Sequence, residues 1–345
     1  MKRHLSISAM LLASALCVSA CHLKPNTNKD KKLSIVTTIF PEYDWVMNIL
    51  GDKKENAEVT MLLDNGVDLH SYQPTADDIV KIKTCDMFIY VGGESDEWVE
   101  DVLETADNKD MVVINLLEEL GDQVKEEELI EGMQGEDEDE HDHDHDDHEE
   151  DHEEDHDHEH HHEEGEVEYD EHVWLSLKNA KILVEKISKK LQTLDATNAD
   201  AFEKNSQAYI EKLDALDKEY EAAVAEGSIK TLLFGDRFPF RYLVDDYGLT
   251  YYAAFIGCSA ETEASFETIA FLSEKVNELN LHTILTIEGS DQKIAKTIVE
   301  NTSSKDQKIM VLDSMQTVTS KDVSGGENYY SVMEKNLEVL KEALK

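Results

Sequence analysis

Basic side chains are scarce in this chain of 345 residues, which has 32 Lys and Arg against 77 Asp and Glu and a formal net charge of −45. Proteins that bind nucleic acid neutralise phosphates with clustered Lys and Arg, so the composition argues against a nucleic acid partner. It also argues against binding to anionic lipid surfaces through protein charge. A surplus of carboxylates suits cations instead.

Apolar runs long enough to cross a bilayer are also missing. The run at 5–17 (LSISAMLLASALC) is too short for a mature transmembrane helix. Lys2 and Arg3 precede it, and the sequence VSAC ending at Cys21 resembles a bacterial lipobox. We therefore expect residues 1–20 to be a lipoprotein signal peptide, Cys21 to carry lipid and 21–32 to form a tether. An ordinary signal peptide cleaved nearby is the alternative. The lipid would anchor the protein outside the cytoplasmic membrane, at the cell surface or the periplasmic face.

Strand-like and helical patterns alternate along the rest of the chain. β-Rich runs lie at 33–38, 59–63, 87–91 and 111–114, and again at 231–234, 250–256, 283–287 and 309–312. Between these two groups, apolar side chains recur at helical spacing over 177–194 and 198–226. We therefore predict an α/β fold with two parallel-sheet lobes, at 33–175 and 196–345, joined by a long linking helix at 176–195.

Cysteines are few, and two of the four, Cys17 and Cys21, belong to the N-terminal segment. Cys85 opens a predicted strand, whereas Cys258 follows one, so the two would lie at opposite sheet ends in different lobes. No disulfide between them is expected. Cys85 fits a small buried residue. For Cys258, a packing or turn role and a role as a soft metal ligand both stay open.

An acidic, His-rich insert interrupts the first lobe at 132–167. Residues 136–164 contain no Lys or Arg, but they include 19 acidic residues and ten histidines. Such a run buries no apolar area, so we expect it to be disordered. Imidazoles beside carboxylates collect cations, and we expect weak binding of several ions here rather than a plain solvated spacer. The histidines are His141, His143, His145, His148, His152, His156, His158, His160, His161 and His162.

Two other histidines are placed for an ordered site. His70 lies in a turn-rich loop after a predicted strand, DNGVDLHSYQPT, and His172 lies where the insert gives way to the linking helix, YDEHVWLSL. Ligand sites of open parallel sheets gather beyond the carboxyl ends of the strands. His282 directly precedes a strand and is expected to be structural.

These segments resemble the zinc and manganese solute-binding lipoproteins of ABC transporters. The resemblance rests on His70 with Tyr72, Pro74 and Thr75, on EHVWLS at 171–176, and on the later stretches FRYLVDDYGL and GCSAETEAS. The lipobox, the His-rich insert and the alternation of strands and helices in two groups agree with this resemblance. The resemblance covers residues from about 33 to 345. It implies a metal site in the cleft between the lobes, with two histidines from the first lobe and two residues from the second.

The resemblance assigns His70 and His172 to the first pair of ligands. For the third, the family usually has a His five positions before the aromatic residue aligned with Tyr242, and this chain has Arg237 there. A guanidinium cannot ligate a cation, so either Asp236 substitutes or Arg237 pairs with an acidic neighbour. Asp313 matches the family's acidic fourth ligand, and Glu288, at a similar strand end, is a further candidate.

The function that follows is capture of Zn²⁺ and its delivery to an ABC-type permease, by a protein expected to be a monomer and not an enzyme. Imidazole with carboxylate suits zinc, although a set of two nitrogens and two oxygens does not exclude Mn²⁺. Three alternatives stay open: a Mn²⁺-binding member of the family, a surface metal buffer or adhesin, and a zinc hydrolase. HExxH is absent, and no general base has a recognisable spacing to either His, which disfavours the hydrolase.

Overall fold

The computed structural model describes residues 32–135, 168–259 and 263–345. The predictions for the lipidated Cys21 and for the ten histidines of the insert lie outside these residues. Within the described ranges, none of the helices combines the length and hydrophobicity that crossing a membrane requires.

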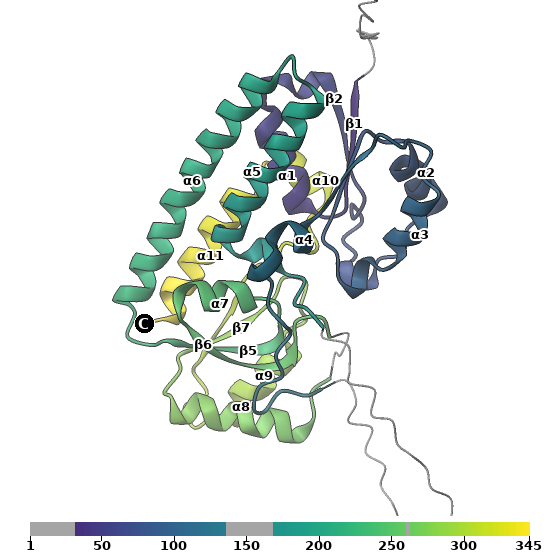
Figure 1. The fold of residues 1–345 in the computed structure, drawn as a ribbon. Coiled ribbons are helices and arrows are strands. Elements are labelled where there is room, and N and C mark those ends of the chain that lie inside the picture. The colour runs from purple at the N-terminus through teal and green to yellow at the C-terminus, as the bar shows by residue number, and fades with distance from the viewer. Residues whose placement is uncertain (1–31, 136–167, 260–262) are drawn as a thin grey trace, which may run out of the picture. The chain divides into compact units, whose positions relative to one another are not determined.

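The first sheet contains four parallel strands in the order β2-β1-β3-β4. Its elements are β1 (Leu33–Thr37), α1 (Phe40–Leu50), β2 (Ala57–Met61), α2 (Ala76–Thr84), β3 (Met87–Tyr90), α3 (Trp98–Glu104), β4 (Val112–Asn115) and α4 (Leu116–Leu120). Helices α2 and α3 lie on one side of this sheet and α1 on the other (Figure 1). The carboxyl ends of its strands carry the loops that reach His70 and Ser95.

The second sheet repeats this arrangement in the order β6-β5-β7-β8, again with all pairs parallel. Its elements are β5 (Thr231–Phe238), α7 (Arg241–Tyr247), β6 (Thr250–Ile256), α8 (Phe266–Glu278), β7 (Thr283–Thr286), α9 (Lys293–Asn301), β8 (Lys308–Val311), α10 (Ser320–Ser324) and α11 (Tyr329–Ala343). The prediction of two parallel-sheet α/β lobes is therefore confirmed.

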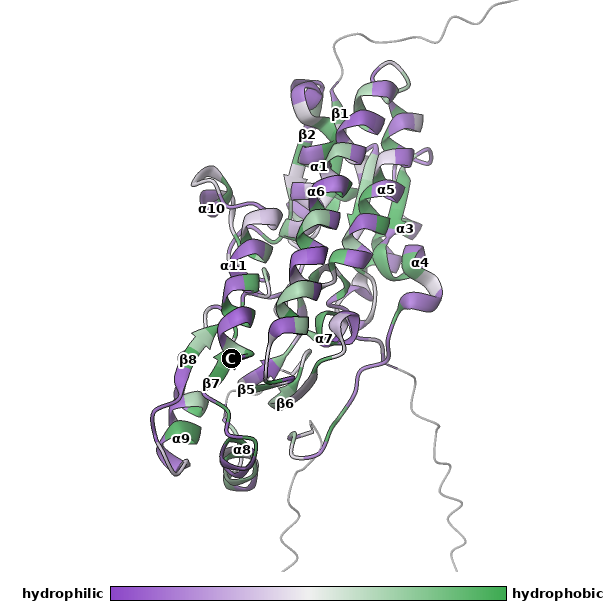
Figure 2. Ribbon diagram, turned by 90° about the vertical axis from the view of Figure 1, so that its left-hand side faces the viewer, coloured by the Kyte–Doolittle hydropathy of each residue, from purple (hydrophilic) through white to green (hydrophobic). Residues whose placement is uncertain are grey.

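Two long helices lie between the sheets in sequence and pack against each other: α5 (Leu177–Leu194) and α6 (Ala199–Glu226). Their predicted apolar stripes face inward, since Val184, Ile187, Leu213 and Tyr220 are fully buried. Polar and apolar residues alternate along α6 in Figure 2, as expected for a helix that buries one side. Helix α5 lies within the predicted linking segment 176–195, while the lobe boundaries themselves stay a prediction.

One large group of buried apolar side chains runs from the first sheet through α5 and α6 to the second sheet, and a smaller one lies beneath α8 and α9. The main departure from the predicted elements is β5, which continues four residues beyond the predicted end at Phe234. The pairing of β5 with β6 shifts register between Phe234 and Arg237. This irregularity lets the strand continue, and it places Arg237 within β5 at the edge of the site.

Candidate metal centre

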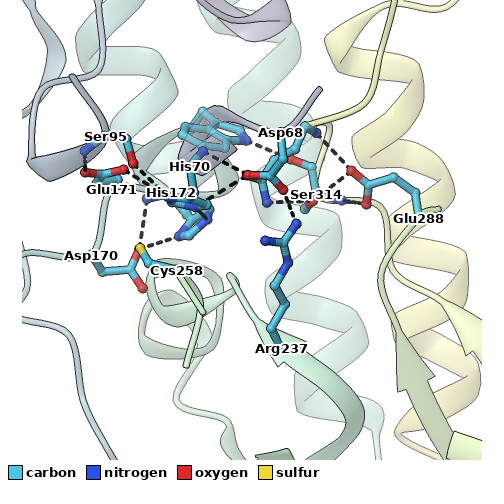
Figure 3. Close-up of polar contacts among 12 residues, drawn as sticks. Asp68, His70, Ser95, Asp170, Glu171, His172, Arg237, Cys258, Glu288 and Ser314 are labelled. Atoms are coloured by element: carbon cyan, nitrogen blue, oxygen red, sulfur yellow. Dashed lines mark hydrogen bonds and ion pairs between the residues drawn. The ribbon is translucent and has the colours of Figure 1, made fainter. Parts of the chain in front are cut away.

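The structure brings His70 and His172 together, although 102 positions separate them in sequence. Their Nε2 atoms are 3.1 Å apart. Figure 3 shows the two histidines side by side. His70 lies in the short 3₁₀ turn Leu69–Ser71 that follows β2, and His172 directly precedes the 3₁₀ turn Val173–Leu175 that leads into α5. Only 9% of the His70 side chain is exposed, and none of the His172 side chain.

The ring of His70 is held through its other nitrogen. Nδ1 lies 2.8 Å from Oγ of Ser95 and 3.4 Å from Oε2 of Glu171. The backbone of His70 is fixed separately, because its N–H donates to Oδ1 of Asp68 over 3.0 Å. Ser95 in turn donates its backbone N–H to Oε1 of Glu171 over 2.9 Å, so a loop after β3 braces both residues.

Asp170 holds His172 in the same way. Oδ1 of Asp170 accepts the backbone N–H of His172 over 2.8 Å and lies 3.0 Å from its Nδ1. The hydroxyl of Tyr242 donates to the Asp170 carbonyl over 2.7 Å, which ties this segment to α7. Gly257 also lies against this ring: a Cβ at this position would be 3.0 Å from Cε1 of His172, so glycine permits the close approach.

These contacts leave the two Nε2 atoms facing each other, with Oδ1 of Asp68 3.9 Å from the Nε2 of His70. A metal-ligating histidine usually donates its second ring N–H to a carboxylate or similar acceptor, and both rings have such an acceptor at Nδ1. When each Nδ1 carries the hydrogen, two Nε2 lone pairs face each other across 3.1 Å. A cation between them removes this repulsion.

The electrostatics of the two rings differ. Burial, and then the neighbouring charge of His172, lower the pKa of His70 to about 3. Burial also acts to lower the pKa of His172, but the charge and hydrogen bond of Asp170 outweigh it and the net shift is upward. His70 is therefore a neutral ligand over the physiological range, while Asp170 makes His172 the more basic ring.

Cys258 completes a compact group with the two histidines. One ring nitrogen of His70, one of His172 and the sulfur of Cys258 all lie within 4.8 Å of one another. Among the described residues, no other group of three or more His, Cys, Asp or Glu side chains comes together this closely. Cys258 follows β6, and its backbone N–H donates to Oε1 of Glu127 over 3.1 Å. Burial, and then the charge of Glu127, raise the pKa of its thiol well above the ordinary range. Cys85 is buried, and both cysteines are free thiols, which confirms that they form no disulfide.

The three predicted acidic ligands lie outside this group. Glu288 accepts hydrogen bonds from the Ser314 N–H at 2.6 Å, the Ser314 hydroxyl at 2.8 Å and the Gln316 N–H at 2.9 Å. Burial and the charge of Glu288 raise the pKa of Asp313 to about 7. Asp236 accepts the Arg237 N–H over 3.0 Å. Their role as ligands stays a prediction.

Arg237 forms an ion pair with Asp68, which joins β5 of the second lobe to the loop that carries His70 (Figure 3). Burial alone would raise the pKa of Asp68, but Arg237 and then His70 bring it below the usual range. Of the two alternatives expected at this position, the structure shows the second: Arg237 pairs with an acidic side chain, that of Asp68. That partner comes from the other lobe, which sequence spacing does not indicate.

Two cavities adjoin the site. One of about 260 Å³ is lined by residues that include His70, Ser95, Glu127, Glu171 and Cys258. The other, of about 740 Å³, is lined by Asp68, Arg237, Asp236 and Glu288 among others. The supporting residues Ser95, Asp170 and Glu127 were not predicted. Asp170, two positions before His172, carried the one local signal, because short acidic side chains bind backbone N–H groups two residues on.

Comparison with known proteins finds one matching family and several similar proteins. The family described as "Zinc-uptake complex component A periplasmic" matches residues 35–343. The zinc-binding lipoprotein AdcA of Streptococcus pneumoniae serotype 4 is 35% identical over 336 residues, which cover 97% of this chain and 60% of AdcA. The high-affinity zinc uptake system protein ZnuA of Bacillus subtilis strain 168 is 30% identical over 338 residues, covering 98% of this chain and 96% of that protein.

Among solved structures, the Zn(II)-bound ZnuA-like domain of Streptococcus pneumoniae AdcA superposes with a TM-score of 0.67 and 32% identity, over 91% of this chain and 99% of that one. The chain thus spans about 60% of the length of AdcA but nearly all of its ZnuA-like domain.

Proposed function

The chain belongs to the zinc-uptake component A family, and from this premise we propose that it captures Zn²⁺ between its two lobes and delivers it to an ABC-type membrane permease. The family is one of transport components, and the chain is not an enzyme. The observation that carries the proposal is the pair of facing Nε2 atoms of His70 and His172, 3.1 Å apart, each on a ring held through Nδ1.

The spacing of these atoms suits zinc. In a tetrahedral site with Zn–N bonds of about 2.0–2.1 Å, two ligating nitrogens lie about 3.3–3.4 Å apart. The observed 3.1 Å needs an adjustment of only a few tenths of an ångström. Mn²⁺, the alternative cargo, favours octahedral coordination by oxygen, and two buried imidazoles supply nitrogen ligands instead.

Asp313, Glu288 and Asp236 are proposed to act from the second lobe. Because they lie outside the histidine group, one of them reaches the ion only if the loops or lobes shift when metal binds. Release at the permease would reverse such a shift. A site built from two lobes can therefore bind tightly in one arrangement and weakly in another.

The remaining parts of the proposal concern location and supply. Lipidation of Cys21 would anchor the chain outside the cytoplasmic membrane beside its permease, as a monomer. The ten histidines between His141 and His162 would collect ions weakly and raise the local zinc concentration around the ordered site. The second candidate function, a surface metal buffer or adhesin, is favoured by this insert alone and assigns no role to His70.

Zinc uptake by cells that depend on this chain tests the proposal. We expect His70→Ala to abolish chain-dependent uptake at scarce zinc, because the ordered site is lost. Deletion of 132–167 should reduce uptake at scarce zinc and leave it unchanged at ample zinc. Full uptake in the His70→Ala strain at scarce zinc would refute capture at this site and favour the buffer function.

A further inference from the structure

We propose that Cys258 is the third ligand of the captured ion, so that the site is a His₂Cys centre with a thiolate from the second lobe. This inference rests on the proposed capture function and narrows its cargo to thiophilic divalent cations, with Zn²⁺ foremost.

Position favours Cys258 over the predicted carboxylates. A tetrahedral site with a Zn–N bond of about 2.0–2.1 Å and a Zn–S bond of about 2.3 Å puts nitrogen and sulfur about 3.5–3.6 Å apart. One ring nitrogen of each histidine and the sulfur of Cys258 already lie within 4.8 Å of one another, so a movement of roughly 1 Å brings them to such distances. Figure 3 shows the sulfur beside both rings, whereas Glu288 lies on the far side of Asp68 and is bound to Ser314.

The backbone holds Cys258 at this position. Its N–H donates to Glu127 over 3.1 Å, which fixes the turn after β6. The preceding residue, Gly257, lies against the ring of His172, where a Cβ would be 3.0 Å from Cε1. Cys258 and His70 are both among the residues that line the cavity of about 260 Å³, through which an ion could enter.

The neighbouring carboxylates of Glu127, Glu171 and Asp170 disfavour a thiolate at Cys258 while no cation is bound, and a bound divalent ion supplies the positive charge that stabilises it. Arg237 cannot ligate, and its charge is paired with Asp68. A divalent ion bound by two neutral imidazoles and one thiolate keeps one positive charge. The Asp170 carboxylate, hydrogen-bonded to His172 at 3.0 Å, offsets that charge.

Binding is a ligand exchange without oxidation or reduction. The S–H bond of Cys258 breaks, the S–metal bond forms, and the proton passes to solvent as the ion gives up a water. Thiolate ligands favour Zn²⁺ over Mn²⁺, which prefers oxygen. Cys258 would therefore determine which metal is retained.

Cobalt substitution of the purified full chain tests this inference. Co²⁺ bound to a thiolate shows an intense near-ultraviolet charge-transfer band that imidazole and carboxylate ligands do not give, and the His-rich insert contains no cysteine. We expect the band in the wild-type chain. We also expect it in the variant Cys17→Ser, Cys21→Ser, Cys85→Ser, in which Cys258 is the remaining cysteine. In Cys258→Ser the band should be lost. Chelator competition should also show that zinc affinity falls by about 100-fold or more. Removing a residue that only supports a ligand costs about 10–100-fold, so a loss of this size indicates a ligand.

Three results separate the outcomes. If Co²⁺ binds with one tight equivalent that His70→Ala removes, but without the charge-transfer band, Cys258 is not a ligand and the capture function stands. If Cys258→Ser keeps both the band and the zinc affinity, the inference is again refuted. If His70→Ala leaves the tightest site intact, the proposed function itself fails. If the Cys258→Ser variant does not fold, Cys258→Ala provides the same test, because it also removes the sulfur and changes no other residue.

Discussion

The carboxylate of Asp170 gives the sharpest test of how the protein prepares His172 for metal. Asp170 is 2% exposed, and its Oδ1 accepts both the backbone N–H and, at 3.0 Å, the Nδ1 of His172. Asp170→Asn keeps the size of the side chain and an oxygen acceptor but removes the negative charge. It should therefore weaken the orientation and the basicity of the ring without opening a cavity.

The expected magnitude follows from the role of such supporting groups. Loss of a carboxylate partner of a ligating histidine typically costs 10–100-fold in metal affinity, or about 1.4–2.7 kcal/mol. We expect Asp170→Asn to fall in this range when zinc affinity is measured by chelator competition near pH 7.5. Asp217→Asn is a matched control: Asp217 is also buried, at 5% exposed, but its partners are Lys181 and Tyr247. It should leave the affinity unchanged.

The pH profile distinguishes this role from a merely structural one. Protonation of Nε2 competes with zinc, and Asp170 raises the pKa of His172. The Asp170→Asn substitution therefore moves the midpoint of the acid-induced loss of zinc binding to lower pH. The difference in zinc affinity between the variant and the wild type should then become smaller as the pH falls. A wild-type affinity in Asp170→Asn, or a loss of equal size at every pH, would refute this reasoning.

Three further changes have defined outcomes. Gly257→Ala places a Cβ 2.9 Å from the Phe238 carbonyl oxygen and 3.0 Å from Cε1 of His172, so chelator competition should show a loss of zinc affinity, whereas Gly248→Ala, with no atom within 4 Å of the added Cβ, should not. Burial raises the pKa of Glu42 from 4.5 to about 8, so the folded chain binds this proton more tightly than the unfolded chain. The free energy of unfolding therefore falls as the pH rises from 4.5 through 8. Glu42→Gln should therefore gain roughly 2–4 kcal/mol relative to wild type between pH 5 and pH 8 in metal-free urea unfolding, and a pH-independent difference would contradict this. Leu213→Ala on α6 removes a fully buried side chain and should cost about 2–5 kcal/mol in urea unfolding, with zinc affinity unchanged under native conditions.

The elements of both lobes follow closely from sequence patterns, for identifiable reasons. Val184, Ile187 and Leu213 belong to the predicted helical stripes and are buried. The β-rich run at 250–256 coincides with β6. The short helices α3, α4 and α10, of five to seven residues, were not predicted, because so few turns carry little periodicity.

The candidate site was predictable only in part. His70 and His172 stood out because the ordered chain has so few histidines and both lie where strands or the insert end. The partnership of Arg237 with Asp68 depends on how two lobes meet, which no local pattern encodes. The proximity of Cys258 to both histidines depends on the close approach of Gly257 to His172, and a glycine after a strand does not reveal which ring it contacts.

The most direct test of the account is the stoichiometry and affinity of zinc binding to the chain lacking 132–167, measured by chelator competition beside the same chain with His70→Ala. The account predicts one tight site per chain, which disappears in the His70→Ala variant. No tight site in the shortened chain, or a tight site that survives His70→Ala, would contradict capture between His70 and His172.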